Sequence, residues 1–223
     1  MKGHDFSCGW VFWGLVSAGC LLILFPVFDL WAASLFFDPQ LHGFCIEIDP
    51  FFRALREAVD GLGRALSATL VLALFILHLI KAQAETKKKA WFLVLCLLLG
   101  PGLIVNGVFK EHWGRPRPKE VLQFEGKKTF VRAAQPSSQC QKNCSFPSGH
   151  ASLGFYFVSF AYVFASRRFW RRCGFWGGAG LGAMRMAQGG HFLSDVVFAG
   201  VFVCGAIWLC AKIMGMARDQ APD

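Results

Sequence analysis

The chain has 223 residues, of which 55% are hydrophobic, and it carries a formal net charge of +9 at pH 7. With 24 phenylalanines and a mean hydropathy of +0.44, it is too apolar for an ordinary soluble domain of this length. The composition therefore predicts an integral membrane protein. Basic residues fall in the short segments between apolar runs, so membrane orientation and anionic lipid explain the charge better than nucleic acid does.

The first apolar segment, Gly9 to Leu30, is long enough to cross a bilayer core of about 30 Å. A cleaved signal peptide is the alternative, because Ala32-Ala33-Ser34 offers small residues, but the apolar run exceeds the usual roughly 7–15 residues. Asp49-Pro50 is then a good helix start. The amphipathic helix that follows either lies in the membrane interface or extends the next spanning helix, and both interpretations stay open.

Five further segments are expected to cross the membrane, and they run from about Leu66 to Ile80, Ala90 to Phe109, His150 to Ala165, Gly174 to Gln188 and Asp195 to Met214. The segment from Gly174 is the least apolar, but Gly174, Gly178 and Gly182 recur every fourth residue and place small residues on one helix face. We therefore predict an all-α polytopic membrane protein with six transmembrane helices, forming a single domain over residues 1–223. The connection from Glu111 to Phe146 is expected to lack regular secondary structure.

Clusters of basic residues set the predicted orientation. They are Lys81, Lys87, Lys88, Lys89, Arg167, Arg168, Arg171 and Arg172, with Lys2 and Arg218 near the chain ends. The positive-inside rule puts these residues in the cytoplasm, although the connection 111–146 on the other side is also basic. Cys140 and Cys144 lie in that connection, on the expected oxidising side, and are predicted to form a disulfide. Four other cysteines lie inside apolar segments and are expected to pack as small hydrophobic residues.

Three polar stretches stand at ends of the apolar segments. They are Lys110 to Arg117-Pro118, Pro147-Ser148-Gly149-His150, and Arg185 through His191 to Asp195. Guanidinium groups match phosphate oxygens, and free N–H groups at a helix start form an anion pocket. His191 and Asp195 are four residues apart, so the carboxylate can accept a hydrogen bond from the imidazole. A metal is not expected, because three converging cations would repel it and no cysteine or second carboxylate completes a ligand set.

These residues resemble the signature of the type 2 phosphatidic acid phosphatase family: Lys-x6-Arg-Pro, Pro-Ser-Gly-His and Ser-Arg-x5-His-x3-Asp. The resemblance covers roughly residues 90 to 200, and Met184 stands where the family usually has Ser. It implies hydrolysis through a phosphohistidine at His191, with Asp195 orienting the ring and His150 protonating the leaving group and then activating water. The residues expected to bind the substrate phosphate are Lys110, Arg117, Ser148, Gly149 and Arg185.

The stretch Gly100 to Arg115 is particularly similar to bacterial lipid A phosphatases within this family. We therefore expect removal of phosphate from a membrane lipid, with lipid A preferred, at the periplasmic face of the inner membrane. Phosphatidylglycerophosphate, phosphatidic acid and undecaprenyl pyrophosphate are alternative substrates. Haloperoxidases share the motifs but are soluble, and a small anion transporter is the alternative from another class.

No cofactor, nucleic acid or obligate protein partner is expected. The connection 111–146 carries surplus cations, namely Lys119, Lys127, Lys128, Arg132 and Lys142. They either bind a large, multiply anionic head group such as that of lipid A or attract anionic lipid generally, and the sequence leaves both interpretations open.

Overall fold

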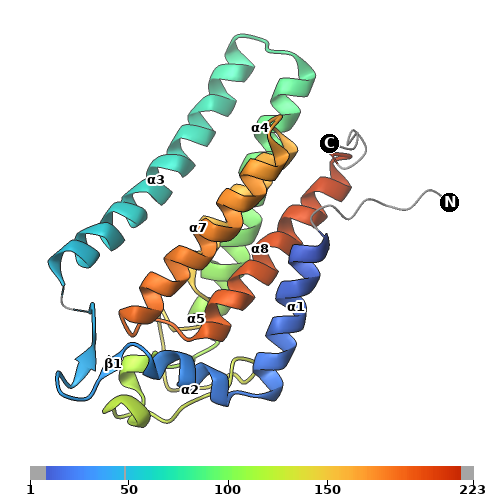
Figure 1. Ribbon diagram of the computed structural model, residues 1–223. Coiled ribbons are helices and arrows are strands. Elements are labelled where there is room, and N and C mark those ends of the chain that lie inside the picture. The colour runs from blue at the N-terminus through green and yellow to red at the C-terminus, as the bar shows by residue number, and fades with distance from the viewer. Residues whose placement is uncertain (1–8, 48, 217–223) are drawn as a thin grey trace.

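The computed structural model describes residues 9–47 and 49–216 and is mainly helical (Figure 1). Its helices are α1 (Gly9–Leu24), α2 (Val27–Ser34), α3 (Pro50–Leu79), α4 (Ala84–Leu97), α5 (Lys110–His112), α6 (Gly149–Tyr156), α7 (Arg167–Ala187) and α8 (Leu193–Ile213). A π-helical segment, Leu98–Phe109, joins α4 to α5, and short 3-10 turns cover Pro118–Glu120, Leu122–Phe124 and Phe157–Tyr162. Strands β1 (Phe37–Asp38) and β2 (Gly43–Phe44) pair antiparallel. Lys2 and Arg218, used for the predicted orientation, lie outside the described residues.

The first apolar segment is broken rather than straight. Helix α1 ends at Leu24, and α2 continues after Pro26 at an angle of 99°. Proline has no N–H to donate to the preceding turn, so the helix cannot run through this position unchanged. Asp29, expected inside a spanning helix, lies instead in α2, where it is fully buried.

Helix α3 resolves the alternative left open by the sequence. The Asp49 carboxylate accepts hydrogen bonds from the N–H groups of Phe51 and Phe52, at 2.9 and 3.3 Å, and Pro50 occupies the first turn. From there one helix continues to Leu79, so the amphipathic segment extends the next apolar helix. In Figure 1, the N-terminal half of α3 leans away from α4, α7 and α8. Polar residues of α3 line both cavities of the site described below.

Within residues 9–47 and 49–216, three helices are long and apolar enough to cross a membrane: Pro50–Leu79, Ala84–His112 and Leu193–Ile213. The bent pair α1 and α2 makes a fourth if it is counted as one crossing. The segment expected from His150 is shorter, because α6 passes into a 3-10 turn that ends at Tyr162. Helix α7 has 21 residues, but its first two turns contain four arginines.

The glycine pattern of α7 has the expected packing role. A Cβ atom at Gly178 would lie 2.5 Å from the Phe155 ring, and one at Gly174 would lie 2.5 Å from the backbone nitrogen of Val158. A Cβ atom at Gly182 would collide with Val196 of α8. The glycines therefore let α7 approach both α6 and α8 closely.

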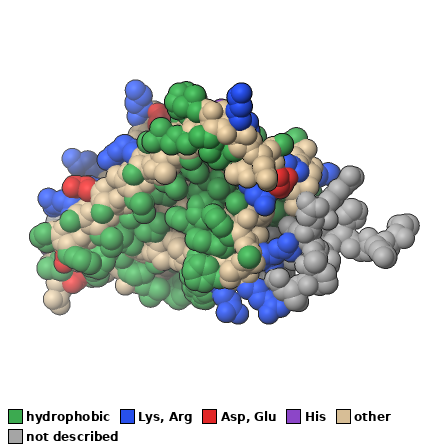
Figure 2. Space-filling model, turned by 90° about the horizontal axis from the view of Figure 1, so that it is seen from above, with side chains coloured by type: hydrophobic (Ala, Val, Ile, Leu, Met, Phe, Trp, Pro, Cys, Tyr) green, Lys and Arg blue, Asp and Glu red, His purple; other side chains and the backbone are tan. Residues whose placement is uncertain are grey.

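The motif segments and the basic clusters lie at opposite ends of the helices. In Figure 1, α5, the end of α7 and the start of α8 lie at the lower end, beside α2 and β1. The turn from α3 to α4 and the start of α7, which carry the basic clusters, lie at the upper end. Figure 2 looks at that upper end and shows basic side chains around the rim of a largely apolar surface. The three motif regions thus share one end of the molecule, as a common site requires.

Candidate active site

Lys110 is delivered by the π-helical segment. Within this segment, the Asn106 side chain donates a hydrogen bond of 2.7 Å to the Pro101 carbonyl. A Cβ atom at Gly149 would lie 2.9 Å from Asn106 Oδ1 and 3.1 Å from Lys110 Nζ. Glycine at this position therefore lets the first and second motifs touch. Short π-helical stretches often occur at functional sites, where they displace side chains from the regular helical positions.

The start of α6 differs from the expectation in one respect. Ser148 is the N-cap, and its side chain accepts a hydrogen bond of 3.4 Å from the Ala151 N–H. Its own N–H donates to the Asp195 carbonyl at 3.0 Å, so this group is not free for an anion. The predicted anion contact of the Ser148 N–H was therefore wrong. Among the described residues the Gly149 N–H has no such acceptor and remains available.

His191 is almost fully buried, with 1% of its surface exposed. Its Nδ1 lies 2.7 Å from the Ser145 carbonyl and 3.6 Å from Asp195 Oδ2, so the carbonyl, rather than the expected carboxylate, is the nearest acceptor. A carbonyl can only accept, so Nδ1 carries the proton and Nε2 keeps its lone pair. Burial lowers the pKa of His191 to about 3, although Asp195 acts in the opposite direction. The ring is thus neutral at pH 7.

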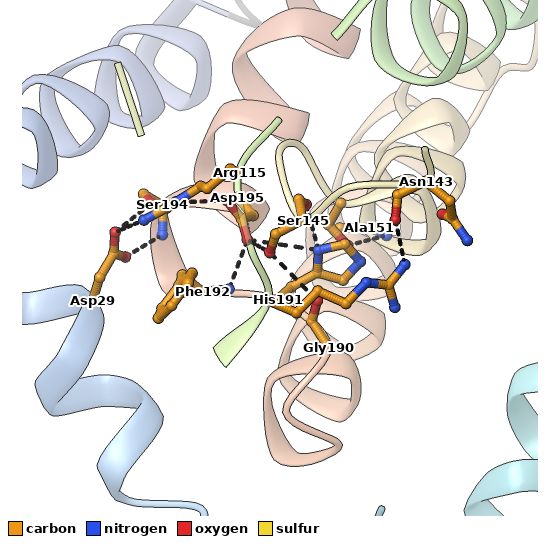
Figure 3. A network of polar contacts seen from close by, with 12 residues as sticks. Asp29, Arg115, Asn143, Ser145, Ala151, Gly190, His191, Phe192, Ser194 and Asp195 are labelled. Carbon is orange, nitrogen blue, oxygen red and sulfur yellow. Dashed lines mark hydrogen bonds and ion pairs between the residues drawn. The ribbon is translucent and has the colours of Figure 1, made fainter. Parts of the chain in front are cut away.

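Asp195 is fully buried at the start of α8 (Figure 3). Its Oδ1 accepts a hydrogen bond of 2.5 Å from Arg115 Nη1. Its Oδ2 accepts hydrogen bonds from the Ser145 hydroxyl at 2.5 Å and the Phe192 N–H at 2.7 Å. These donors hold the carboxylate ionised and fix its position beside the His191 ring.

Arg115 and Asp29 are the residues that sequence reasoning missed. Arg115 is fully buried, and its Nη2 donates to Asp29 Oδ2 at 2.7 Å while its Nε donates to the Val131 carbonyl at 2.8 Å. Asp29 also accepts from the N–H and the hydroxyl of Ser194, at 2.8 and 2.5 Å. One signal was available, because a carboxylate within an apolar segment is costly and indicates a buried partner. Figure 3 shows the resulting row from Asp29 through Arg115 to Asp195.

His150, in the first turn of α6, meets helix α3. Its Nε2 lies 3.3 Å from Asp60 Oδ1, but the pair is not aligned for a hydrogen bond, and this buried nitrogen has no hydrogen-bond partner in the described structure. The atom is therefore available to a ligand. Asp60 belongs to the polar face of α3, which was not expected to take part in the site.

The two motif arginines are held by their surroundings. Arg117 Nη2 donates to the Asn143 carbonyl at 2.7 Å, and Arg185 Nη1 donates to the Gln188 side chain. The Nε of Arg185 is buried without a hydrogen-bond partner in the described part of the chain. Lys110 interacts electrostatically with both arginines. His150 and His191 each interact with Lys110 and Arg185. All five predicted charged or titratable groups that would meet the phosphate thus belong to one cluster.

Two cavities border this cluster. The first, of about 370 Å³, is lined by Lys110, Gly149 and His150 together with residues of α3 and α4. The second, of about 250 Å³, is lined by Arg117 and Arg185 together with the start of α3. Within residues 9–47 and 49–216, no group of three or more His, Cys, Asp or Glu side chains is arranged to hold a metal ion.

Fixed cations and two histidines thus gather at one end of a bundle of apolar helices, an arrangement that suits a phosphate group. The sequence matches the PAP2 superfamily over residues 89–219, and the chain belongs to that superfamily. The resemblance inferred from the three motifs is thereby confirmed.

The chain is also similar to curated proteins along most of its length. It is 40% identical to a lipid A 4'-phosphatase of Francisella tularensis subsp. novicida, over 91% of this chain and 93% of that protein. Lipid A 4'-phosphatases of Rhizobium leguminosarum and Rhizobium etli are 33% and 32% identical over 95% of this chain, covering 95% and 86% of those proteins. No solved structure matches the chain.

Proposed function

We propose that this protein hydrolyses a phosphate monoester of lipid A through a covalent intermediate on His191. The observation that carries the proposal is that Lys110, Arg117, Arg185 and the two histidines form one cluster of interacting groups beside two cavities. The names of the three relatives, which share nearly the whole length of the chain, support lipid A as the substrate.

In the first step, His191 Nε2 attacks phosphorus while the bond from phosphorus to the sugar oxygen breaks. His150 is protonated when the substrate binds, because the phosphate dianion beside it favours the cationic ring. The leaving oxygen takes this proton from His150 Nε2, which has no other hydrogen-bond partner among the described residues. Lys110, Arg117 and Arg185 offset the charge on the non-bridging oxygens, and the Gly149 N–H adds a neutral donor. Asp195 and the Ser145 carbonyl stabilise the ring as it becomes positive.

In the second step, water attacks the phosphorus of the phosphohistidine and gives its proton to His150. The bond from phosphorus to nitrogen breaks, inorganic phosphate leaves and His191 regains its lone pair. Each histidine thus ends the cycle in its starting state. The cationic side chains carry the charge stabilisation, so the proposed steps involve no metal ion.

We further propose that six segments cross the inner membrane and that the site faces the periplasm. The separation of the basic clusters from the motif end supports this orientation. The disulfide between Cys140 and Cys144, predicted from the sequence and present at the motif end, supports an oxidising surrounding.

The test is phosphate release by the purified protein from lipid A, phosphatidic acid, phosphatidylglycerophosphate and undecaprenyl pyrophosphate. We expect lipid A to be preferred and His191→Asn to lower kcat by at least about 10³-fold. His112→Gln is the matched control, because His112 is exposed and its ring donates to the Val108 carbonyl of the preceding π-helical segment. Preference for another lipid would refute the substrate, and the absence of phosphate release from every lipid would leave the anion transporter.

A further inference from the structure

The surplus cations of the connection 111–146 are partly neutralised. Lys119 Nζ lies 2.6 Å from Glu47 Oε1, and Lys128 Nζ lies 3.0 Å from Glu120 Oε1. Charges that already have carboxylate partners attract a substrate less than free charges do. The connection is therefore weaker as a head-group site than its composition suggested.

Helix α3 instead adds arginines to the active site. Arg53 and Arg56 line the cavity of about 250 Å³ together with the motif residues Arg117 and Arg185. Lys119 and Glu47, which pair with each other, complete its charged lining. Among the described residues, the lining therefore contains four arginines and one carboxylate, Glu47. Because Glu47 is paired with Lys119, no carboxylate of the lining is free to neutralise the arginines.

The backbone of α3 next to Arg53 is held at the active site by a specific contact. Gln188 Nε2 donates a hydrogen bond of 3.1 Å to the Phe52 carbonyl, and its Oε1 accepts one from Arg185. A single side chain thus ties the start of α3 to a phosphate-binding arginine. Residues 53 and 56 are three apart, so they lie on the same face of α3. Arg56 lines the same cavity as Arg117 and Arg185, and its charge repels both of them.

The number of cations exceeds what the scissile phosphate requires. A phosphate monoester carries at most two negative charges, and Lys110, Arg117 and Arg185 already face its oxygens in the proposed function. Arg53 and Arg56 have no ion-pair partner in the described structure. Like charges gathered in one cavity disfavour each other unless an anion binds between them. The cavity is also several times larger than the roughly 30 Å³ that one water molecule takes up.

We infer that Arg53 and Arg56 bind a second anionic group of the substrate head group, next to the phosphate that is removed. This inference rests on the proposed function and specifies its substrate class. The preferred lipid carries a further phosphate or a carboxylate on the same head group. Helix α3 is then a specificity element, and the three motifs supply the chemistry.

The test compares Arg53→Gln/Arg56→Gln with the wild type in detergent, on four substrates. They are bisphosphorylated lipid A, lipid A that carries only the phosphate to be removed, that monophosphoryl lipid with acidic sugars attached, and short-chain phosphatidic acid. We expect the KM for substrates with a second anion to rise about tenfold per arginine, since each charge-assisted hydrogen bond has about that weight. The KM for the other two should change less than about twofold. Loss confined to bisphosphorylated lipid A identifies a phosphate as the second anion, and loss confined to the lipid with acidic sugars identifies a carboxylate.

Lys127→Gln is the matched control, because Lys127 is an exposed cation that does not line the cavity. Arg53→Lys/Arg56→Lys should recover part of the lost affinity. If Arg53→Gln/Arg56→Gln does not fold, Arg53→Gln and Arg56→Gln are tested separately, and each should show about half of the effect on a logarithmic scale. Equal losses on all four substrates, or none on any, would overturn the inference.

Failure of the proposed function gives a different result. If the wild type hydrolyses phosphatidic acid but not lipid A, the function is wrong, and the second-anion site is then tested by inhibition. Bisphosphorylated lipid A should compete with phosphatidic acid more strongly than monophosphoryl lipid A does, and the arginine variant should abolish this difference. Equal inhibition by the two lipids would reject the site as well.

Discussion

Replacement of Asp29 by asparagine tests whether the buried row from Asp29 to Asp195 positions the nucleophile. Asp29 accepts three hydrogen bonds, one from Arg115 and two from Ser194, and it is fully buried. An amide of the same shape has one acceptor oxygen, so its NH₂ group must face a donor. Arg115 would also lose one of the two carboxylates that balance its charge.

The expected cost follows from these contacts. Breaking a buried ion pair by removal of one partner costs about 3–5 kcal/mol, of which an unsatisfied donor accounts for about 1–3 kcal/mol. Because about 1 kcal/mol corresponds to about 2–4 °C in a chain of this size, Asp29→Asn should lower the Tm by roughly 6–20 °C. Asp195 would then be the single carboxylate that pairs with Arg115, and the guanidinium would neutralise more of its charge. We expect kcat to fall about 10- to 100-fold, or about 1.4–2.7 kcal/mol of transition-state stabilisation.

The assay is phosphate release at a temperature at which both proteins are folded, with kcat and KM measured separately. A positioning role lowers kcat and changes KM less than about twofold, because the phosphate-binding cations are untouched. Glu125→Gln is the matched control, since its ion pair with His42 is 49–74% exposed and should contribute less than about 1 kcal/mol. The reasoning would be refuted if Asp29→Asn lost no more stability than Glu125→Gln, or if KM rose at constant kcat.

Two further predictions concern pH and topology. Below pH 6.5, the unfolded chain binds a proton at His191 that the folded chain, with a pKa of about 3 at this residue, does not bind. The free energy of unfolding should therefore fall by about 1.4 kcal/mol per pH unit as the pH drops from 6.5 toward 3. This part of the fall should be absent in His191→Asn. Parallel Tm curves for the two proteins from pH 7.5 to pH 5 would contradict the prediction. In a cysteine-depleted background, a cysteine at Gln123 should react with an impermeant thiol reagent applied to the periplasmic side, and one at Lys88 should not; the opposite pattern would place the site in the cytoplasm.

The sequence predicted the features that depend on local spacing. The glycines of α7 were placed on one helix face by their period of four, and they indeed contact α6 and α8. The three motifs were expected at one end because each stands where an apolar segment stops. Asp49-Pro50 was expected to start a helix, and it starts α3. In all these cases the signal is a spacing or a boundary that can be read within a short stretch of sequence.

The features that the sequence did not predict depend on contacts distant in sequence. Asp29 and Arg115 are 86 residues apart, and a hydropathy average over the first apolar segment hides both the carboxylate and the break at Pro26. The acceptor for His191 is a backbone carbonyl, and because every residue has one, the amino-acid types do not indicate it. The polar face of α3 was visible as a pattern, but the pattern does not say that Gln188 fixes it at the active site.

The charges of the buried row explain why it suits the proposed chemistry. Two carboxylates, Asp29 and Asp195, share one arginine, so the row carries one net negative charge while His191 is neutral. Attack on phosphorus makes the imidazole ring positive, and the row and the ring are then balanced. A buried excess charge weakens the resting protein, because it has lost its hydration. In the intermediate the same charge is paired, so the row stabilises the phosphohistidine more than the free histidine, which is the difference that accelerates a reaction.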